Sequence, residues 1–214
     1  MKKCVFLFML LFLPVGMSLP WPGFVPQLFA GEGSVKILIL GDSLGAGLGV
    51  EPQQAFPALI RDRLKLKGFD HVSLINGSIS GSTTAGAVSR LKWFLRIKPD
   101  ILVLALGAND GLRGLSIRQM TRNLDKTIVL AKEKRLRVIL AGMKLPPNYG
   151  PEYAKAFEAV FASLAQKHDL PFIPFLLKDV AGIASLNQAD GIHPNAKGHK
   201  IIAATVFDCI LKQL

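Results

Sequence analysis

Five short apolar runs recur along the sequence, and a longer segment with helical spacing follows each of them. The runs span residues 35–40, 72–75, 101–106, 138–141 and 172–175. The helical segments span residues 55–66, 83–95, 117–134, 153–168 and 195–211. Because the runs lack the alternation of a half-exposed strand, they predict strands that are covered on both faces.

Strand and helix therefore alternate five times, which is typical of a parallel sheet with helices on both faces. We predict an α/β fold: a flavodoxin-like three-layer α/β/α sandwich with a five-stranded parallel sheet. The 214 residues are enough for one well-packed domain, and the sequence shows no internal repeat. Ser116 and Gln119 have the spacing of a capping box at the start of the third helical segment.

The first 30 residues need a separate interpretation. Lys2 and Lys3 precede an apolar run at residues 5–15, as in a secretory signal peptide. The run is short for a membrane span and contains Pro14, although an uncleaved N-terminal anchor and a buried helix are alternatives. We therefore expect a signal peptide at residues 1–30, a mature domain at residues 31–214, and a periplasmic or secreted protein.

The mature domain is basic. Removing residues 1–30 takes two lysines from the 26 basic residues and leaves the 15 acidic ones, a net charge of +9. The basic residues fall in helix-like stretches such as 61–67 and 131–137, which indicates solvated helix faces. The alternative role of these basic residues is peripheral contact with an anionic membrane. We also expect the protein to be a monomer. No aromatic residues alternate with these basic residues, so we expect no nucleic-acid partner.

Ligands of an open parallel sheet bind beyond the carboxyl ends of its strands, so the residues after each strand are informative. Glycine-rich segments follow the expected strands at residues 41–47, 76–83, 107–111 and 190–194. Each segment alone is typical of a turn. Together they place a serine, a histidine, an acidic residue and several hydrogen-bond donors at one edge of the sheet.

The first of these segments can be mistaken for two common motifs, but neither explains it. Gly45, Gly47 and Gly49 have the spacing G-x-G-x-G rather than the G-x-G-x-x-G of dinucleotide-binding folds, and the second strand ends at Asn76 rather than at an acidic residue. Residues 41–45 also match G-x-S-x-G, the nucleophile elbow of α/β-hydrolases. That elbow follows several strands, whereas Ser43 follows the first one.

Four blocks in this order resemble the SGNH (GDSL) hydrolase superfamily: GDSLGAG at 41–47, GS at 81–82, GAND at 107–110 and DGIHP at 190–194. A closer likeness is to its acyl-CoA thioesterase I, lysophospholipase and arylesterase subgroup. That likeness is carried by AFPALI at 55–60, GANDGLRG at 107–114, LPPNYG at 145–150 and DGIHPN at 190–195. Gly45 and Phe56 depart from the serine and tryptophan common in relatives, which bears on substrate preference rather than on the chemistry.

The resemblance implies that Ser43 is the nucleophile of a catalytic triad, with His193 as its general base and Asp190 as the acid that orients the base. A serine hydroxyl must lose its proton as it attacks, and a histidine can take that proton. Only two residues separate Asp190 from His193, so both side chains can point from one tight turn. Pro194 favours an extended backbone at His193 and suits the first position of the following helix.

The resemblance also implies an oxyanion hole, which stabilises the negative charge of the tetrahedral intermediate. Its donors are expected to be the backbone N–H groups of Ser43 and Gly81 and the side-chain amide of Asn109. We expect no cofactor and no metal. A metal site of Asp190, His193 and His199 is an alternative, but the last helix would carry His199 away from the pocket.

We therefore predict a serine esterase or thioesterase that hydrolyses medium-to-long acyl chains from acyl-CoA thioesters, lysophospholipids or aryl esters. Leu145, Pro146 and Tyr149 belong to a loop that follows the fourth strand, so we expect them to bind the acyl substrate. A carbohydrate O-acetyl esterase, which would use the same catalytic residues, is one alternative. The other is a non-catalytic lipid- or glycan-binding domain, which would have no need of them.

Overall fold

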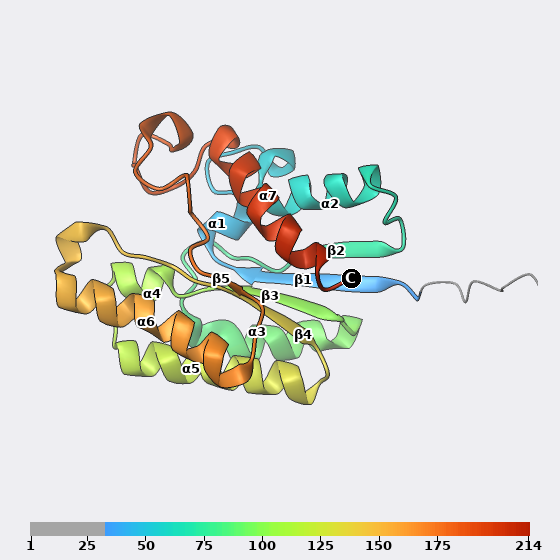
Figure 1. The fold of residues 1–214 in the computed structure, drawn as a ribbon, viewed down its shortest axis with the longest axis horizontal. Coiled ribbons are helices and arrows are strands. Elements are labelled where there is room, and N and C mark those ends of the chain that lie inside the picture. The colour runs from blue at the N-terminus through green and yellow to red at the C-terminus, as the bar shows by residue number, and fades with distance from the viewer. Residues whose placement is uncertain (1–32) are drawn as a thin grey trace, which may run out of the picture. The chain divides into compact units, whose positions relative to one another are not determined.

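The computed structural model describes residues 33–214, and the expected signal peptide at residues 1–30 lies outside the described residues. Five parallel strands form one sheet in the order β2-β1-β3-β4-β5 (Figure 1). The strands are β1 (Val35–Gly41), β2 (Val72–Asn76), β3 (Ile101–Ala105), β4 (Arg137–Ala141) and β5 (Phe172–Ile173). This is the strand order of flavodoxin-like folds, so the predicted fold class is confirmed.

Seven α-helices of residues 33–214 flank this sheet. They are α1 (Ser43–Ala46), α2 (Phe56–Leu66), α3 (Ala87–Phe94), α4 (Ala108–Leu112), α5 (Ile117–Glu133), α6 (Pro151–His168) and α7 (Ala196–Leu211). Figure 1 shows α2 and α7 on one face of the sheet and α3, α5 and α6 on the other. None of the helices described is long and apolar enough to cross a membrane.

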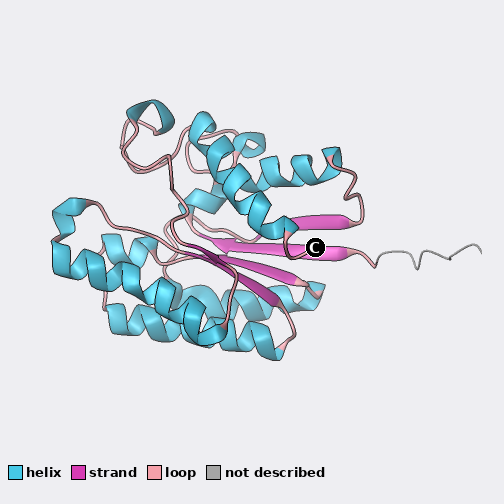
Figure 2. Ribbon diagram, viewed as in Figure 1, coloured by secondary structure: helices cyan, strands magenta, loops and turns pink. Residues whose placement is uncertain are grey.

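The core lies between the sheet and its two helix layers. Figure 2 shows the strands in magenta between the helices in cyan. Residues 37–40 of β1 and residues 101–104 of β3 are fully buried. These strands pair with each other in the register Ile37↔Ile101, so the two longest apolar runs form the centre of the sheet. A strand that is covered on both faces needs apolar side chains at successive positions, which explains why these runs lack alternation.

Most elements lie within two residues of their predicted bounds, and two of the differences have a clear physical cause. β5 pairs with β4 through two residues only, because Pro174 has no N–H group with which to continue the ladder. The helix predicted at residues 83–95 becomes α-helical only at Ala87, after a 3₁₀ turn at Thr84–Gly86. The N–H of Thr84 donates to Asp110 of α4 at 2.9 Å. The short helices α1 and α4 have no counterpart in the prediction.

The helix starts agree only in part with the expected caps. The Oγ of Ser116 accepts the N–H of Gln119 at 3.3 Å, but the side-chain amide of Gln119 donates to Asn123 instead of completing the capping box. Asn195 caps α7, because its Oδ1 accepts two N–H groups of the first helical turn. The prediction that Pro194 occupies the first helical position is therefore wrong, since Pro194 precedes the cap.

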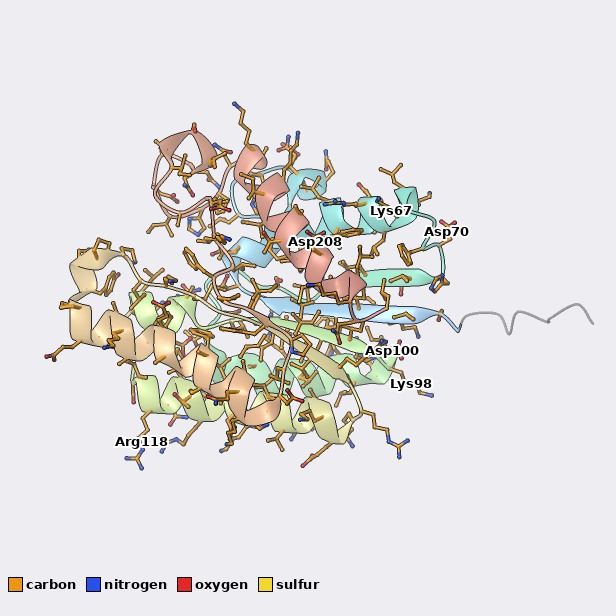
Figure 3. All side chains as sticks on the ribbon, in the orientation of Figure 1. Lys67, Asp70, Lys98, Asp100, Arg118 and Asp208 are labelled. Atoms are coloured by element: carbon orange, nitrogen blue, oxygen red, sulfur yellow. The ribbon has the colours of Figure 1, made fainter. Side chains whose placement is uncertain are left out.

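Charged residues brace the amino edge of the sheet. The Oδ2 of Asp100 accepts the N–H of Lys36 at 2.8 Å, and the N–H of Asp100 donates to the carbonyl oxygen of Lys36 at 2.8 Å. Figure 3 labels Asp100 and its neighbour Lys98 at this edge. The loops that contain the expected site follow the other ends of the strands, at the carboxyl edge.

Candidate active site

Ser43 follows β1 and is the first residue of the one-turn helix α1. The preceding Asp42 caps this helix, because its Oδ1 accepts the N–H of Leu44 at 3.1 Å. Gly47 ends the helix in the left-handed region, at φ 73°, where a residue with a side chain would be strained. The strand and these two caps therefore fix the backbone on both sides of Ser43.

His193 and Asp190 come from the turn before α7 and are in direct contact. The Nδ1 atom of His193 lies 2.6 Å from the Oδ2 atom of Asp190. The Oδ1 atom of Asp190 accepts the N–H of Ile192 at 2.9 Å and the N–H of His193 at 3.0 Å. Gly191 has a φ of 71°, which allows this tight turn. The turn thus holds the carboxylate and the imidazole ring together.

The same hydrogen bonds keep Asp190 ionised. The hydrogen bonds from the backbone N–H of His193, from the His193 side chain and from the N–H of Ile192 together lower the pKa of Asp190 to about 2. An ionised carboxylate accepts a hydrogen bond from Nδ1–H of a neutral histidine ring. The other ring nitrogen, Nε2, is then an acceptor.

That acceptor faces the serine. The Nε2 atom of His193 lies 3.0 Å from the Oγ atom of Ser43, although 150 positions separate the two residues in the sequence. Asp190, His193 and Ser43 therefore form one continuous series of hydrogen bonds. A series in this order can take a proton from the serine hydroxyl as the oxygen attacks.

The second and third glycine-rich segments are joined to each other. The Nδ2 of Asn109, in α4, donates to the carbonyl oxygen of Ser82 at 3.1 Å, and its second N–H remains for another acceptor. The buried Asp110 accepts the hydroxyl of Thr84 at 2.6 Å. These bonds hold the segment that contains Gly81, whose φ of 75° favours glycine.

A cavity of about 480 Å³ opens at this edge, and Ser43, Asn109 and His193 line it. The other lining residues are mainly apolar and come from the loops after β3, β4 and β5. Lys144 is a charged residue of the lining, and the largest apolar ones are Leu112, Met143, Leu145, Phe175, Leu177 and Ile192. The reactive groups therefore face a space that suits an apolar substrate group.

Of the three expected substrate-binding residues, two line the cavity and one does not. Leu145 and Pro146 line the cavity, but Tyr149 does not. The hydroxyl of Tyr149 donates to the carbonyl oxygen of Leu112 at 2.9 Å, so its side chain braces the loop against the end of α4. Gly81 also lies outside the lining, and its carbonyl oxygen accepts from Arg113 at 3.0 Å.

Part of the cavity wall was not identified from the sequence. Phe175, Leu177 and Ala181 line the cavity from the segment after β5. The prediction assigns Phe175 to the fifth strand, whereas the strand ends before Pro174 and Phe175 turns to the cavity. The available signal was that proline, which cannot donate to a strand ladder.

A second group of polar side chains lies beneath the Ser43 turn. Asp42 is fully buried, and this burial raises the pKa of its carboxyl to about 6. Arg90 of α3 donates from Nη2 to the carbonyl oxygen of Gly41 at 2.9 Å and to that of Gly77. These bonds tie the end of β1 to the loop after β2. Sequence analysis did not identify Arg90, because one basic residue in an amphipathic helix gives no distinct signal.

His199, the third residue of the alternative metal site, has a different environment. It is buried between α7 and α2, where its Nδ1 accepts the N–H of Phe56 at 3.2 Å and its ring stacks on the Phe56 ring. Burial lowers the pKa of His199 to about 4, so the ring is neutral and can accept that bond. Phe56 is itself fully buried, so its difference from the common tryptophan concerns the core rather than the cavity.

An α/β sandwich with a serine, a histidine and an aspartate in contact at the carboxyl edge of its sheet has the arrangement of a serine hydrolase. The chain belongs to the GDSL-like lipase/acylhydrolase family, whose model matches residues 39–201. The resemblance to the SGNH (GDSL) superfamily is thereby confirmed, and the protein is an ester hydrolase.

Named relatives agree with this family. The chain is 42% identical to esterase TesA of Pseudomonas aeruginosa, over 74% of this chain and 79% of the relative. It is 38% identical to an arylesterase of Vibrio mimicus, over 86% of this chain and 92% of the relative. It is 36% identical to thioesterase 1/protease 1/lysophospholipase L1 of Escherichia coli K12, over 92% of this chain and 91% of the relative. The crystal structure of TesA has a TM-score of 0.80 at 38% identity and covers 84% of this chain and 99% of that one.

Proposed function

We propose that the protein hydrolyses carboxylic esters and thioesters through an acyl-enzyme on Ser43. The observation that carries this proposal is the hydrogen-bonded series in which the His193 ring lies 2.6 Å from Asp190 and 3.0 Å from Ser43. In this proposal His193 is the general base, and Asp190 holds the ring in the correct tautomer and stabilises the cation that forms.

The reaction has two halves. His193 Nε2 takes the proton of Ser43 as the serine oxygen attacks the acyl carbonyl carbon. The negative oxygen of the tetrahedral intermediate accepts hydrogen bonds from the N–H groups of Ser43 and Gly81 and from the amide of Asn109. His193 then protonates the leaving alcohol or thiol, while the acyl group stays on the serine. A water molecule, deprotonated by His193, releases the acid and restores the enzyme.

The shape and lining of the cavity support acyl chains of medium to long length. Leu112, Leu145, Phe175 and Leu177 offer apolar contacts along a volume of about 480 Å³. Each buried methylene contributes up to about 0.8 kcal/mol, so four further carbons could raise kcat/KM by roughly tens to hundreds of fold. The names of the relatives suggest thioesters, lysophospholipids and aryl esters as the substrate classes to test.

The same cavity distinguishes the alternatives. A carbohydrate O-acetyl esterase needs room for a two-carbon acyl group and polar contacts to a sugar, whereas this wall is mainly apolar. A non-catalytic lipid-binding domain would not need a serine, a histidine and an aspartate in hydrogen-bond contact. The cavity and the contacts therefore favour the long-chain hydrolase over both.

A panel of p-nitrophenyl esters tests the proposal directly. The acyl groups should run from acetyl to palmitoyl, each below its micelle concentration, with an acyl-CoA and a lysophospholipid added. We expect kcat/KM to rise from acetyl to octanoyl, and Ser43→Ala to abolish hydrolysis without unfolding the protein, because it removes only one hydroxyl. A best rate with acetyl would support the deacetylase, and a Ser43→Ala rate above about a hundredth of wild type would require another nucleophile.

Further proposals concern the location of the protein. We propose that residues 1–30 direct export and are removed, so that the enzyme acts in the periplasm or outside the cell as a monomer. We also propose peripheral contact with anionic membranes, supported by the positive net charge. N-terminal sequencing and size-exclusion chromatography of the exported protein test the first of these.

A further inference from the structure

The positive charge of the protein is concentrated in one helix layer. Residues 87–98, which contain α3, and residues 117–137, which contain α5, hold eleven basic and two acidic residues, a net charge of +9. The rest of residues 33–214 holds thirteen basic and twelve acidic residues. α3 and α5 are packed together on the same face of the sheet, as Figure 1 shows, so the exposed basic residues of the two helices lie on the same side of the sheet.

Exposed side chains of these two helices form that surface, which we call the basic face. It consists of Lys92, Trp93, Arg96 and Lys98 from α3 and the turn after it, and of Arg118, Arg122, Lys126 and Val129 from α5. On α5 these residues recur three or four positions apart, opposite the buried Met120, Leu124 and Ile128. Figure 3 shows the Arg118 side chain extending away from the ribbon.

The cations of the basic face have no acidic partners within the described part of the chain. In residues 33–214, the ion pairs of lysine or arginine involve cations outside the basic face: Arg61–Asp62, Lys144–Glu158 and Lys167–Asp125. Asp125 belongs to α5 but contacts Lys167 and His168 of α6. A cluster of uncompensated like charges attracts an anionic partner.

One aromatic side chain lies among these cations. Trp93 is 54% exposed, and the guanidinium of Arg96 stacks over its ring at 3.5 Å from the centroid. Tryptophan favours the boundary between lipid headgroups and acyl chains, and clustered basic residues favour anionic headgroups. A single-stranded nucleic acid would instead favour several aromatic side chains along a groove.

We propose that the basic face docks on the surface of an anionic lipid bilayer, with Trp93 at the level of the headgroups. This inference rests on the proposed peripheral contact with anionic membranes and names the surface that makes it. None of the residues that line the candidate active-site cavity belongs to the basic face. Docking through this helix layer therefore leaves the cavity uncovered for substrates at the bilayer surface.

Vesicle binding tests the proposal with the full chain. Co-sedimentation should be measured with vesicles of phosphatidylcholine alone and with about 30% phosphatidylglycerol added, at low and high salt. The first variant combines Arg118→Gln, Arg122→Gln and Lys126→Gln, which removes three charges from the basic face. A second variant, Trp93→Ser, keeps every charge but removes the aromatic ring.

A matched control removes the same charge from the opposite face of the sheet. It combines Lys65→Gln, Lys67→Gln and Lys200→Gln, which are exposed on or next to α2 and on α7. Figure 3 labels Lys67 in this layer. All variants should give the circular-dichroism spectrum and the urea unfolding midpoint of wild type, within error, which confirms that they are folded.

We expect wild type to bind only the anionic vesicles, and less at high salt. Each basic residue near an anionic surface contributes about fivefold to partitioning, so the α5 variant should bind at least about tenfold more weakly. The control should lose less than about threefold, because its charges lie away from the contact. Trp93→Ser should weaken binding by about threefold or more.

Three results would overturn the proposal. Equal losses in the α5 variant and its control would mean that net charge alone, and not this face, causes binding. Tighter binding to DNA than to anionic vesicles, with the same dependence on α5, would identify a nucleic-acid partner instead. Absence of wild-type binding would reject both the face and the membrane contact. Because vesicle binding requires no turnover, none of these results depends on the proposed hydrolytic activity, which the ester panel reports separately.

Discussion

The buried carboxyl of Asp42 should make the stability of the protein depend on pH in a way that one substitution removes. Burial raises the pKa of Asp42 from 3.8 to about 6, and so outweighs the hydrogen bond from the N–H of Leu44 and the nearby charges of His193 and Arg90. The folded protein therefore binds this proton more tightly than the unfolded chain does.

The sign and size of the effect follow from this difference. A pKa raised from 3.8 to about 6 corresponds to about 3 kcal/mol, at 1.36 kcal/mol per pH unit. Because the folded state holds the proton more tightly, this contribution to the free energy of unfolding is fully present below pH 3.8. It is lost as the pH rises through about 6, and so is absent at neutral pH.

Asp42→Asn isolates this effect. The asparagine keeps an oxygen that can accept the N–H of Leu44, but it cannot titrate. The free energy of unfolding of wild type, minus that of the variant, should fall by about 2.5 kcal/mol between about pH 4 and pH 7.5. Taking the difference removes the pH dependence that both proteins share, and the guanidinium of Arg90 stays protonated throughout this range, so it adds a constant offset.

Urea unfolding followed by circular dichroism, in steps of about half a pH unit, measures this difference. Asp208→Asn is the matched control, because Asp208 is exposed on α7, as labelled in Figure 3, and its substitution should give a nearly constant difference. If the difference for Asp42→Asn also stayed constant within about 0.5 kcal/mol, Asp42 would titrate as an ordinary carboxyl and the argument from burial would fail.

Three further substitutions test single contacts of the candidate site. Asp190→Asn should lower kcat on a p-nitrophenyl ester more than about tenfold, because the amide cannot hold the His193 ring in the required tautomer; an unchanged rate would remove Asp190 from that role. Asn109→Ala should lower kcat by roughly 10²–10³, whereas a rise in KM alone would make Asn109 a ground-state contact. Tyr149→Phe should cost about 1 kcal/mol in urea unfolding and leave the acyl-chain profile unchanged, and a shifted profile would place Tyr149 beside the substrate.

The architecture could be predicted because it depends on local patterns. Each of the five apolar runs became a strand, since a strand with helices on both faces must be apolar at successive positions. The contact between Asp190 and His193 was also within reach, because only two residues separate them. Errors arose where a local rule met a longer-range contact, as at Thr84, whose N–H and hydroxyl bond to Asp110 rather than starting a helix.

The sequence by itself therefore determined the fold class, the carboxyl edge as the location of the site, and the family. Only the tertiary structure decided which atoms meet there. The 3.0 Å contact between His193 and Ser43 spans 150 positions, and no periodicity or spacing encodes it. The cavity wall at Phe175, the displacement of Tyr149 from that wall and the bonds of Arg90 beneath the nucleophile are similar cases. Each depends on how helices and loops from distant segments pack on the sheet, and that packing is a property of the whole chain rather than of any local stretch.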